Sequence, residues 1–235
     1  MGFFAAIGSF FSSAVSAICS AVSSIGSALS SFASGVGMVL ATVIEKIQPI
    51  AEAIGKVANA LLSGLGILRP NETIEDIGER ALQARAQGIT IDQFPNFDDY
   101  MKALRDIDLD EDLKRTRNPT ERMLAGLGIG SLALEKKYDL PEGSMGALWL
   151  LPAANPEYFT ADRLGEWIQN GRLAVNIYDY LEQKLSGEES SRFERGLSVE
   201  MTDAQKSALY DALDSAQRKV QEWAREAREQ GNQTP

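Results

Sequence analysis

The sequence contains no histidine, a single cysteine and, over its first 44 residues, no charged side chain. The absence of histidine removes the commonest metal ligand and general base in proteins. One cysteine cannot form an internal disulfide, and we predict that Cys19 packs as a small apolar residue. The composition therefore predicts no cofactor and no metal site.

Charge is distributed unevenly along the 235 residues. Residues 1–68 contain only Glu45, Lys46, Glu52 and Lys56, so the whole net charge of −10 belongs to residues 69–235. Nucleic acids and anionic lipid surfaces attract clusters of lysine and arginine, which an acidic segment of this kind does not offer. We therefore expect no nucleic-acid partner for this chain.

A seven-residue pattern runs through the charge-free region. Apolar residues recur at alternating steps of three and four, which predicts a helix with one apolar seam that packs against other helices or against lipid. Ordinary coiled coils carry glutamate and lysine beside such a seam, whereas this helix carries none. The predicted seam residues are Val15, Ile18, Val22, Ile25, Leu29, Phe32, Val36 and Val39.

Serine and small residues occupy the remaining faces of this helix. An uncharged hydroxyl face can contact water, another helix or the lumen of a pore without the cost of burying a charge. The predicted polar or pore-lining face consists of Ser13, Ser16, Ser20, Ser23, Ser27, Ser30 and Ser34. Gly26 and Gly35 flank the seam and allow close backbone approach, and Gly35 and Gly37 mark the expected bend of a helix over residues 3–44.

The pattern of the whole chain predicts an all-α fold in two parts. A second amphipathic helix over residues 50–66 completes an uncharged helical hairpin, which we call the head and place at residues 1–69. Residues 70–230, the body, form an acidic multi-helix domain. Residues 89–94 are expected to be a connection, a helix is expected over 161–186 with a break at Asn170, and residues 231–235 are expected to be a disordered tail.

Two further charge-free stretches lie in the body, at residues 123–134 and 144–156. Each is too short to span a bilayer, so the first interpretation is that they form central core helices. A second interpretation concerns three alternating glycines, Gly126, Gly128 and Gly130. These would let the helix dock closely on the head.

No catalytic constellation emerges, and we predict that the chain is not an enzyme. The acidic cluster at 106–112 lacks the glycine and the bidentate glutamate of a calcium loop, which favours a solvated turn. The segment 136–143 loosely resembles the one that precedes the catalytic glutamate of lytic transglycosylases. In this sequence Pro152-Ala153 stands where that acid belongs.

Three hypotheses for function follow from the head. In size and in its uncharged glycine- and serine-rich helices, the chain resembles small pore-forming effectors of bacterial type VI secretion. The resemblance covers residues 1–68 and implies a protein that is soluble in the producing bacterium, then secreted and inserted as an oligomer into a target lipid bilayer. It also implies a secretion-apparatus partner and an immunity protein. The second hypothesis is a self-assembling structural or ejection component of a phage or contractile injection particle. The third is an interaction protein whose head binds a chaperone or another partner protein.

Overall fold

The computed structural model describes residues 3–173 and 176–231, and the fold is all-α. Thirteen α-helices and two short 3-10 helices, η1 and η2, account for its regular structure, with no strand among the described residues. The segment 89–94 is a connection that contains η1 (Ile91–Gln93), as predicted.

Four helices make up the head. They are α1 (Phe3–Ser23), α2 (Ser27–Ser34), α3 (Val36–Lys46) and α4 (Gln48–Gly64). The chain bends by 59° between α2 and α3, at Gly35, where the glycines predicted a bend. A second break, at residues 24–26, was not predicted. Pro49 stands in the first turn of α4, where a missing backbone N–H costs nothing.

The body begins with helices that are capped by their own sequence. Thr73 caps the helix that begins at Ile74 and forms a capping box with Asp76. Asn118 caps the helix that begins at Pro119, where it accepts a hydrogen bond from the backbone N–H of Thr120. Gly88, which lies just after the end of the first of these helices, has a positive φ of 83°, a conformation that glycine adopts readily. These helices are α5 (Ile74–Ala86), α6 (Phe97–Asp106), α7 (Glu111–Thr116) and α8 (Pro119–Lys137).

The second half of the body differs from the prediction. The break expected at Asn170 is confirmed, because the first helix ends at Gln169 with Asn170 as its C-cap, but the second part extends only over residues 177–181. A further helix follows because Ser186 and Glu189 form a capping box that starts it. Gly231, expected in a disordered tail, is the last residue of the final helix, and residues 232–235 lie outside the described residues. The elements are η2 (Gly146–Trp149), α9 (Leu150–Ala154), α10 (Ala161–Gln169), α11 (Ile177–Leu181), α12 (Gly187–Leu197) and α13 (Asp203–Gly231).

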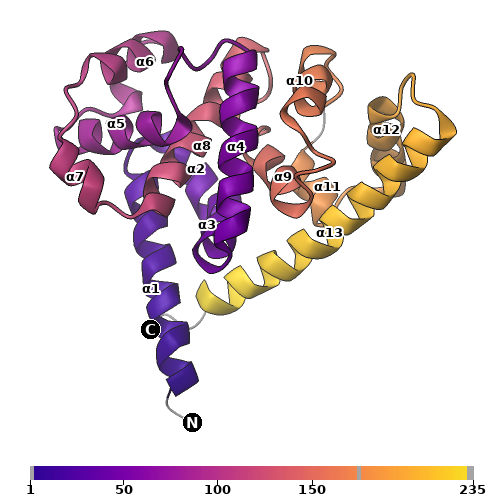
Figure 1. The fold of residues 1–235 in the computed structure, drawn as a ribbon, viewed down its shortest axis with the longest axis horizontal. Helices are drawn as coiled ribbons and strands as arrows, with labels where there is room; N and C mark the ends of the chain where they lie inside the picture. Colours follow the sequence, from indigo (N-terminus) through magenta and orange to yellow (C-terminus); the bar gives the residue numbers. More distant parts are fainter. Residues whose placement is uncertain (1–2, 174–175, 232–235) are drawn as a thin grey trace.

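Helix α8 is the centre of the molecule. All of its residues from 123 to 135 are buried, which confirms that this charge-free stretch is a core helix. It packs against α1, α2, α3, α4 and α5, so head and body share one hydrophobic core. Figure 1 shows α8 behind α4, with the long α13 running diagonally below α9 and α11 toward α3. Lys46 on α3 and Glu226 on α13 form an ion pair of 2.7 Å where these helices meet.

Candidate functional site

The seam of the head faces the interior. Val22, Ile25 and Leu29 are fully inaccessible to solvent, so the register inferred from the spacing agrees with the fold. The other seam residues are also buried, except two that are half-buried and pack against the core. The buried ones are Val15, Ile18, Val22, Ile25, Leu29 and Val39, and the half-buried ones are Phe32 and Val36. Cys19 is buried, as predicted, and burial raises the pKa of its thiol to about 11.

The glycines of α8 lie against both parts of the molecule. A Cβ atom at Gly128 would lie 2.5 Å from Leu29 and 3.0 Å from Phe32, both on α2. A Cβ at Gly130 would lie 2.8 Å from a methyl group of Leu62 on α4. These distances are shorter than ordinary carbon contacts, so a side chain at either position would force Leu29, Phe32 or Leu62 to shift, and the two glycines permit the close packing of the head on α8.

Gly126, in contrast, faces the body. Its Cβ would lie 2.0 Å from the carbonyl oxygen of Ile74, and a Cβ at Gly78 would lie 1.9 Å from the carbonyl oxygen of Arg122. The backbones of α5 and α8 therefore cross in direct contact, through one glycine on each helix. Sequence reasoning singled out Gly126 but missed Gly78, because the partner of a small residue on another helix leaves no mark in local spacing.

The predicted serine face lies on the outside of the protein. Ser20 and Ser34 are exposed, whereas Ser23 is half-buried. Serine is commonly exposed on protein surfaces, so the exposure of these residues in this fold does not indicate that they line a pore. The exposed members of the face are Ser13, Ser16, Ser20, Ser27, Ser30 and Ser34.

One serine forms a link between head and body. The backbone N–H of Ser27 donates to the Asp92 carboxylate at 2.9 Å, and its hydroxyl donates to the same group at 2.6 Å. Asp92 therefore caps the first turn of α2 from a distant segment. Beside it, Ile91 donates its backbone N–H to the carbonyl oxygen of Ile25, and Gly26 leaves no room for a side chain against Ile91.

The remaining predicted small residues lie within the bent head. Gly37 is buried, and its Cβ would lie 2.9 Å from the carbonyl oxygen of Phe32 in the preceding helix. Gly35 is half-buried and forms the bend itself. Gly37 thus permits the tight packing of α2 against α3, and Gly35 lies at the turn between them.

A buried polar network holds the central helix to η2. The indole N–H of Trp149 donates to the Ser131 hydroxyl at 2.8 Å, and the Ser131 hydroxyl donates to the carbonyl oxygen of Leu127. Glu135 accepts hydrogen bonds from the backbone N–H groups of Gly143 and Met145, in the segment that leads into η2. Burial raises the pKa of Glu135 above its ordinary value. This network was not predicted, because its members are ordinary residues that only the fold brings together.

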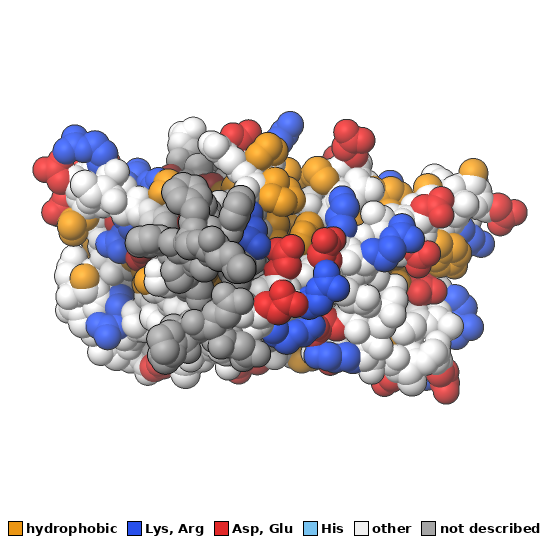
Figure 2. Space-filling view, turned by 90° about the horizontal axis from the view of Figure 1, so that it is seen from below, with side chains coloured by type: hydrophobic (Ala, Val, Ile, Leu, Met, Phe, Trp, Pro, Cys, Tyr) orange, Lys and Arg blue, Asp and Glu red, His pale blue; other side chains and the backbone are white. Residues whose placement is uncertain are grey.

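Two further observations bear on membrane contact and metal binding. No single helix whose residues are described is long and apolar enough to cross a bilayer, while α2 and α3 together reach that length and composition as a bent pair. The described residues include no cluster of three or more metal-ligating side chains. Figure 2 shows charged side chains of both signs between small orange areas on the described part of the lower face.

Comparison with protein-family models, with curated proteins and with solved structures produced no match to this chain.

Proposed function

We propose that the chain is a membrane-inserting, pore-forming protein, secreted by a bacterium against other cells, and that the described fold is its form before insertion. The observation that carries the proposal is the contact between two charge-free segments. Helices α2 and α3 contain no charged residue before Glu45. Both pack on α8, and α2 does so at Gly128 in the charge-free centre of that helix. Both segments that lipid would accept are kept together inside the protein.

The physical basis of insertion is an exchange of one apolar environment for another. The seam of the head is buried against α8 in this fold, and acyl chains would bury the same residues in a membrane. The N-terminal end of α1 projects beyond the other helices in Figure 1, and the sequence of its first ten residues has four phenylalanines and no charge. This end would reach a bilayer first.

The contact between Gly26 and Ile91 offers a direct test, because insertion of the head requires this contact to break. The two Cβ positions are 3.3 Å apart, close to the roughly 3.5–4.5 Å found in disulfides. We would introduce Gly26→Cys and Ile91→Cys together with Cys19→Ala, and measure dye release from vesicles of phosphatidylcholine and phosphatidylglycerol. The oxidised protein should release no dye, and reduction of the same sample should restore release.

The reduced double-cysteine protein controls for the substitutions, and the single Ile91→Cys variant controls for the loss of that side chain. If the oxidised protein released as much dye as the reduced protein, dye release would not require the head to leave its place on the body. No release from the unmodified protein at any protein-to-lipid ratio would refute pore formation altogether.

A second measurement examines the serine face. Ser20 and Ser34 are exposed in this fold, so replacing both with leucine should leave the protein folded. If these residues line a water-filled path in an oligomer, the double variant should bind vesicles as well as the parent but conduct no ions. Unchanged conductance would exclude a serine-lined path.

A further inference from the structure

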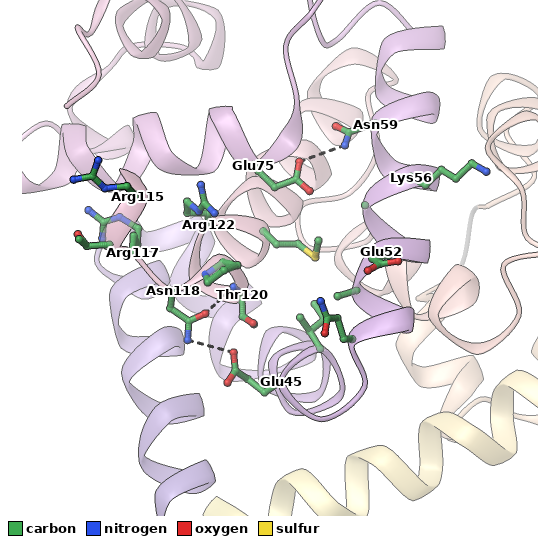
Figure 3. Close-up of a pocket in the computed structure, with 17 residues that line it drawn as sticks. Glu45, Glu52, Lys56, Asn59, Glu75, Arg115, Arg117, Asn118, Thr120 and Arg122 are labelled. Carbon is green, nitrogen blue, oxygen red and sulfur yellow. Dashed lines mark hydrogen bonds between the residues drawn. The ribbon is translucent and has the colours of Figure 1, made fainter. Parts of the chain in front are cut away.

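A cleft of about 1030 Å³ lies between α4 and the corner where α7 meets α8 (Figure 3). Its floor includes the apolar residues Ile44, Ala51 and Met123. One wall belongs to the head, with α4 and the end of α3, and the other belongs to the body, with α5, α7 and the first turn of α8. The size suits a small organic molecule, since such ligands occupy pockets of about 300–1,000 Å³.

Arg122, in the first turn of α8, stands in this cleft without a counter-ion. Its Nε atom is buried and has no hydrogen-bond partner, and its side chain forms no ion pair with any described residue. A buried donor that lacks a partner is destabilising, and more so when it is charged. An anion that enters the cleft would supply this partner and would also compensate the charge.

The neighbouring arginines show the contrast. Arg117 pairs with Glu79 at 3.1 Å and with Glu121 at 2.8 Å, and Arg115 pairs with Asp112 at 2.9 Å. Their charges are already compensated by carboxylates of the body. Figure 3 shows them on the same side of the cleft as Arg122.

The α4 wall of the cleft, together with Glu75 from α5, has the opposite character. Glu52 forms no hydrogen bond or ion pair with the described residues, and Glu75 accepts only one weak bond, of 3.3 Å, from the Asn59 amide. Lys56 points away from these groups in Figure 3. The α4 side thus offers free acceptors, while the α8 side offers one uncompensated cation, Arg122.

We infer that this cleft binds a small zwitterionic molecule, whose phosphate or carboxylate lies at Arg122 and whose amine lies toward Glu52 and Glu75. An anion alone would satisfy Arg122 but would face the acidic side of the cleft. An amine alone would leave the Arg122 guanidinium unpaired. A two-ended ligand complements both sides, because opposite charges at short range favour binding and like charges oppose it.

Isothermal titration calorimetry on the full chain tests this inference with four probes. O-phosphoethanolamine and 4-aminobutyrate are zwitterions that carry a phosphate and a carboxylate respectively, and inorganic phosphate and ethanolamine supply the separate ends. Arg122→Met removes the anion site, Glu52→Gln removes one acceptor, and Arg192→Met is the matched control. Arg192 is an exposed arginine on α12 outside the cleft, and its replacement changes the net charge equally.

At least one zwitterion should bind saturably, and Arg122→Met should weaken its binding about tenfold or more, equivalent to about 1.4 kcal/mol. Glu52→Gln should weaken zwitterion binding without changing the binding of inorganic phosphate, and Arg192→Met should change neither. The preferred zwitterion then identifies the anionic group. Absence of saturable binding by both zwitterions, equal affinity of Arg122→Met, or tighter binding of phosphate alone would overturn the inference.

The inference does not depend on pore formation, because calorimetry involves no membrane. Its connection with the proposed function is geometric, since head and body both line the cleft. A ligand bound there contacts both and should therefore slow dye release by the full chain, in proportion to its occupancy.

Discussion

Replacing Gly78 with alanine should strongly destabilise the protein. The added Cβ would lie 1.9 Å from the carbonyl oxygen of Arg122 and 2.7 Å from the backbone nitrogen of Gly126. Both neighbours are backbone atoms of α8, so no side-chain rotation can relieve the overlap. Reaching even 3.0 Å would require α5 and α8 to separate by about 1.1 Å, in a core where packing tolerates little displacement.

Alanine is intrinsically the better helix former, by about 1 kcal/mol, so the observed effect will be the steric cost less this gain. Overpacking of a rigid core costs about 1–3 kcal/mol and sometimes more, and the movement of a whole helix places Gly78→Ala at the upper end. A net loss of about 2 kcal/mol corresponds to a melting temperature lower by about 4–8 °C for a chain of this size.

The same substitution at Gly196 provides the matched control. Gly196 lies in α12, and no described heavy atom lies within 4 Å of its Cβ position. Gly196→Ala should therefore stabilise the protein by roughly 0.5 kcal/mol through helix propensity alone. Urea unfolding followed by far-ultraviolet circular dichroism measures both variants. Equal free energies of unfolding for the two would refute the close crossing of α5 and α8.

Three further predictions concern charge, capping and the thiol. The pKa values of Glu72 and Asp76 lie below their ordinary values of 4.5 and 3.8 because, although partial burial opposes the shift, each accepts a hydrogen bond from a basic side chain. The unfolded chain therefore binds protons first as the pH falls. The free energy of unfolding that these two carboxylates contribute should be constant down to about pH 5 and should be lost below about pH 4.5. Glu72→Gln should reduce that loss, as measured by urea titrations at each pH. Asp92→Ala should lower the free energy of unfolding by about 1 kcal/mol because it removes the cap from α2, whereas Asp92→Asn should keep most of that stability. Equal losses in the two variants would contradict the capping role. Cys19, whose pKa burial raises to about 11, should react with Ellman's reagent only after unfolding in urea, and rapid labelling of the folded protein would show that the α1 seam opens readily.

Much of the local structure was decided by the sequence. The three-and-four spacing of Val22, Ile25 and Leu29 determined which face of the head is buried, because any helix with such a stripe must remove it from water. Helix caps are also local: Asn118 precedes Pro119 at the start of α8, and Ser186 forms a capping box with Glu189 at the start of α12.

The break at residues 24–26 could not be predicted, because its cause lies outside the helix. Asp92 caps α2 from 65 residues away, and Ile91 occupies the space beside Gly26. The apolar spacing alone would continue one helix through residues 24–26. The distant segment instead forms hydrogen bonds with the chain at this break, from Ile91 to Ile25 and from Ser27 to Asp92.

The tertiary structure alone decided what the charge-free segments contact. Spacing shows that the seam requires an apolar partner, but burial against α8 and burial in lipid satisfy it equally, since the hydrophobic effect is not directional. The structure places Gly128 against Leu29 and Gly126 against Ile74, an assignment that depends on the three-dimensional path of the backbone. Arg122 is likewise distinguished from other arginines only by the absence of a counter-ion in the folded chain, because ion pairs form between residues that folding, and not sequence order, makes neighbours.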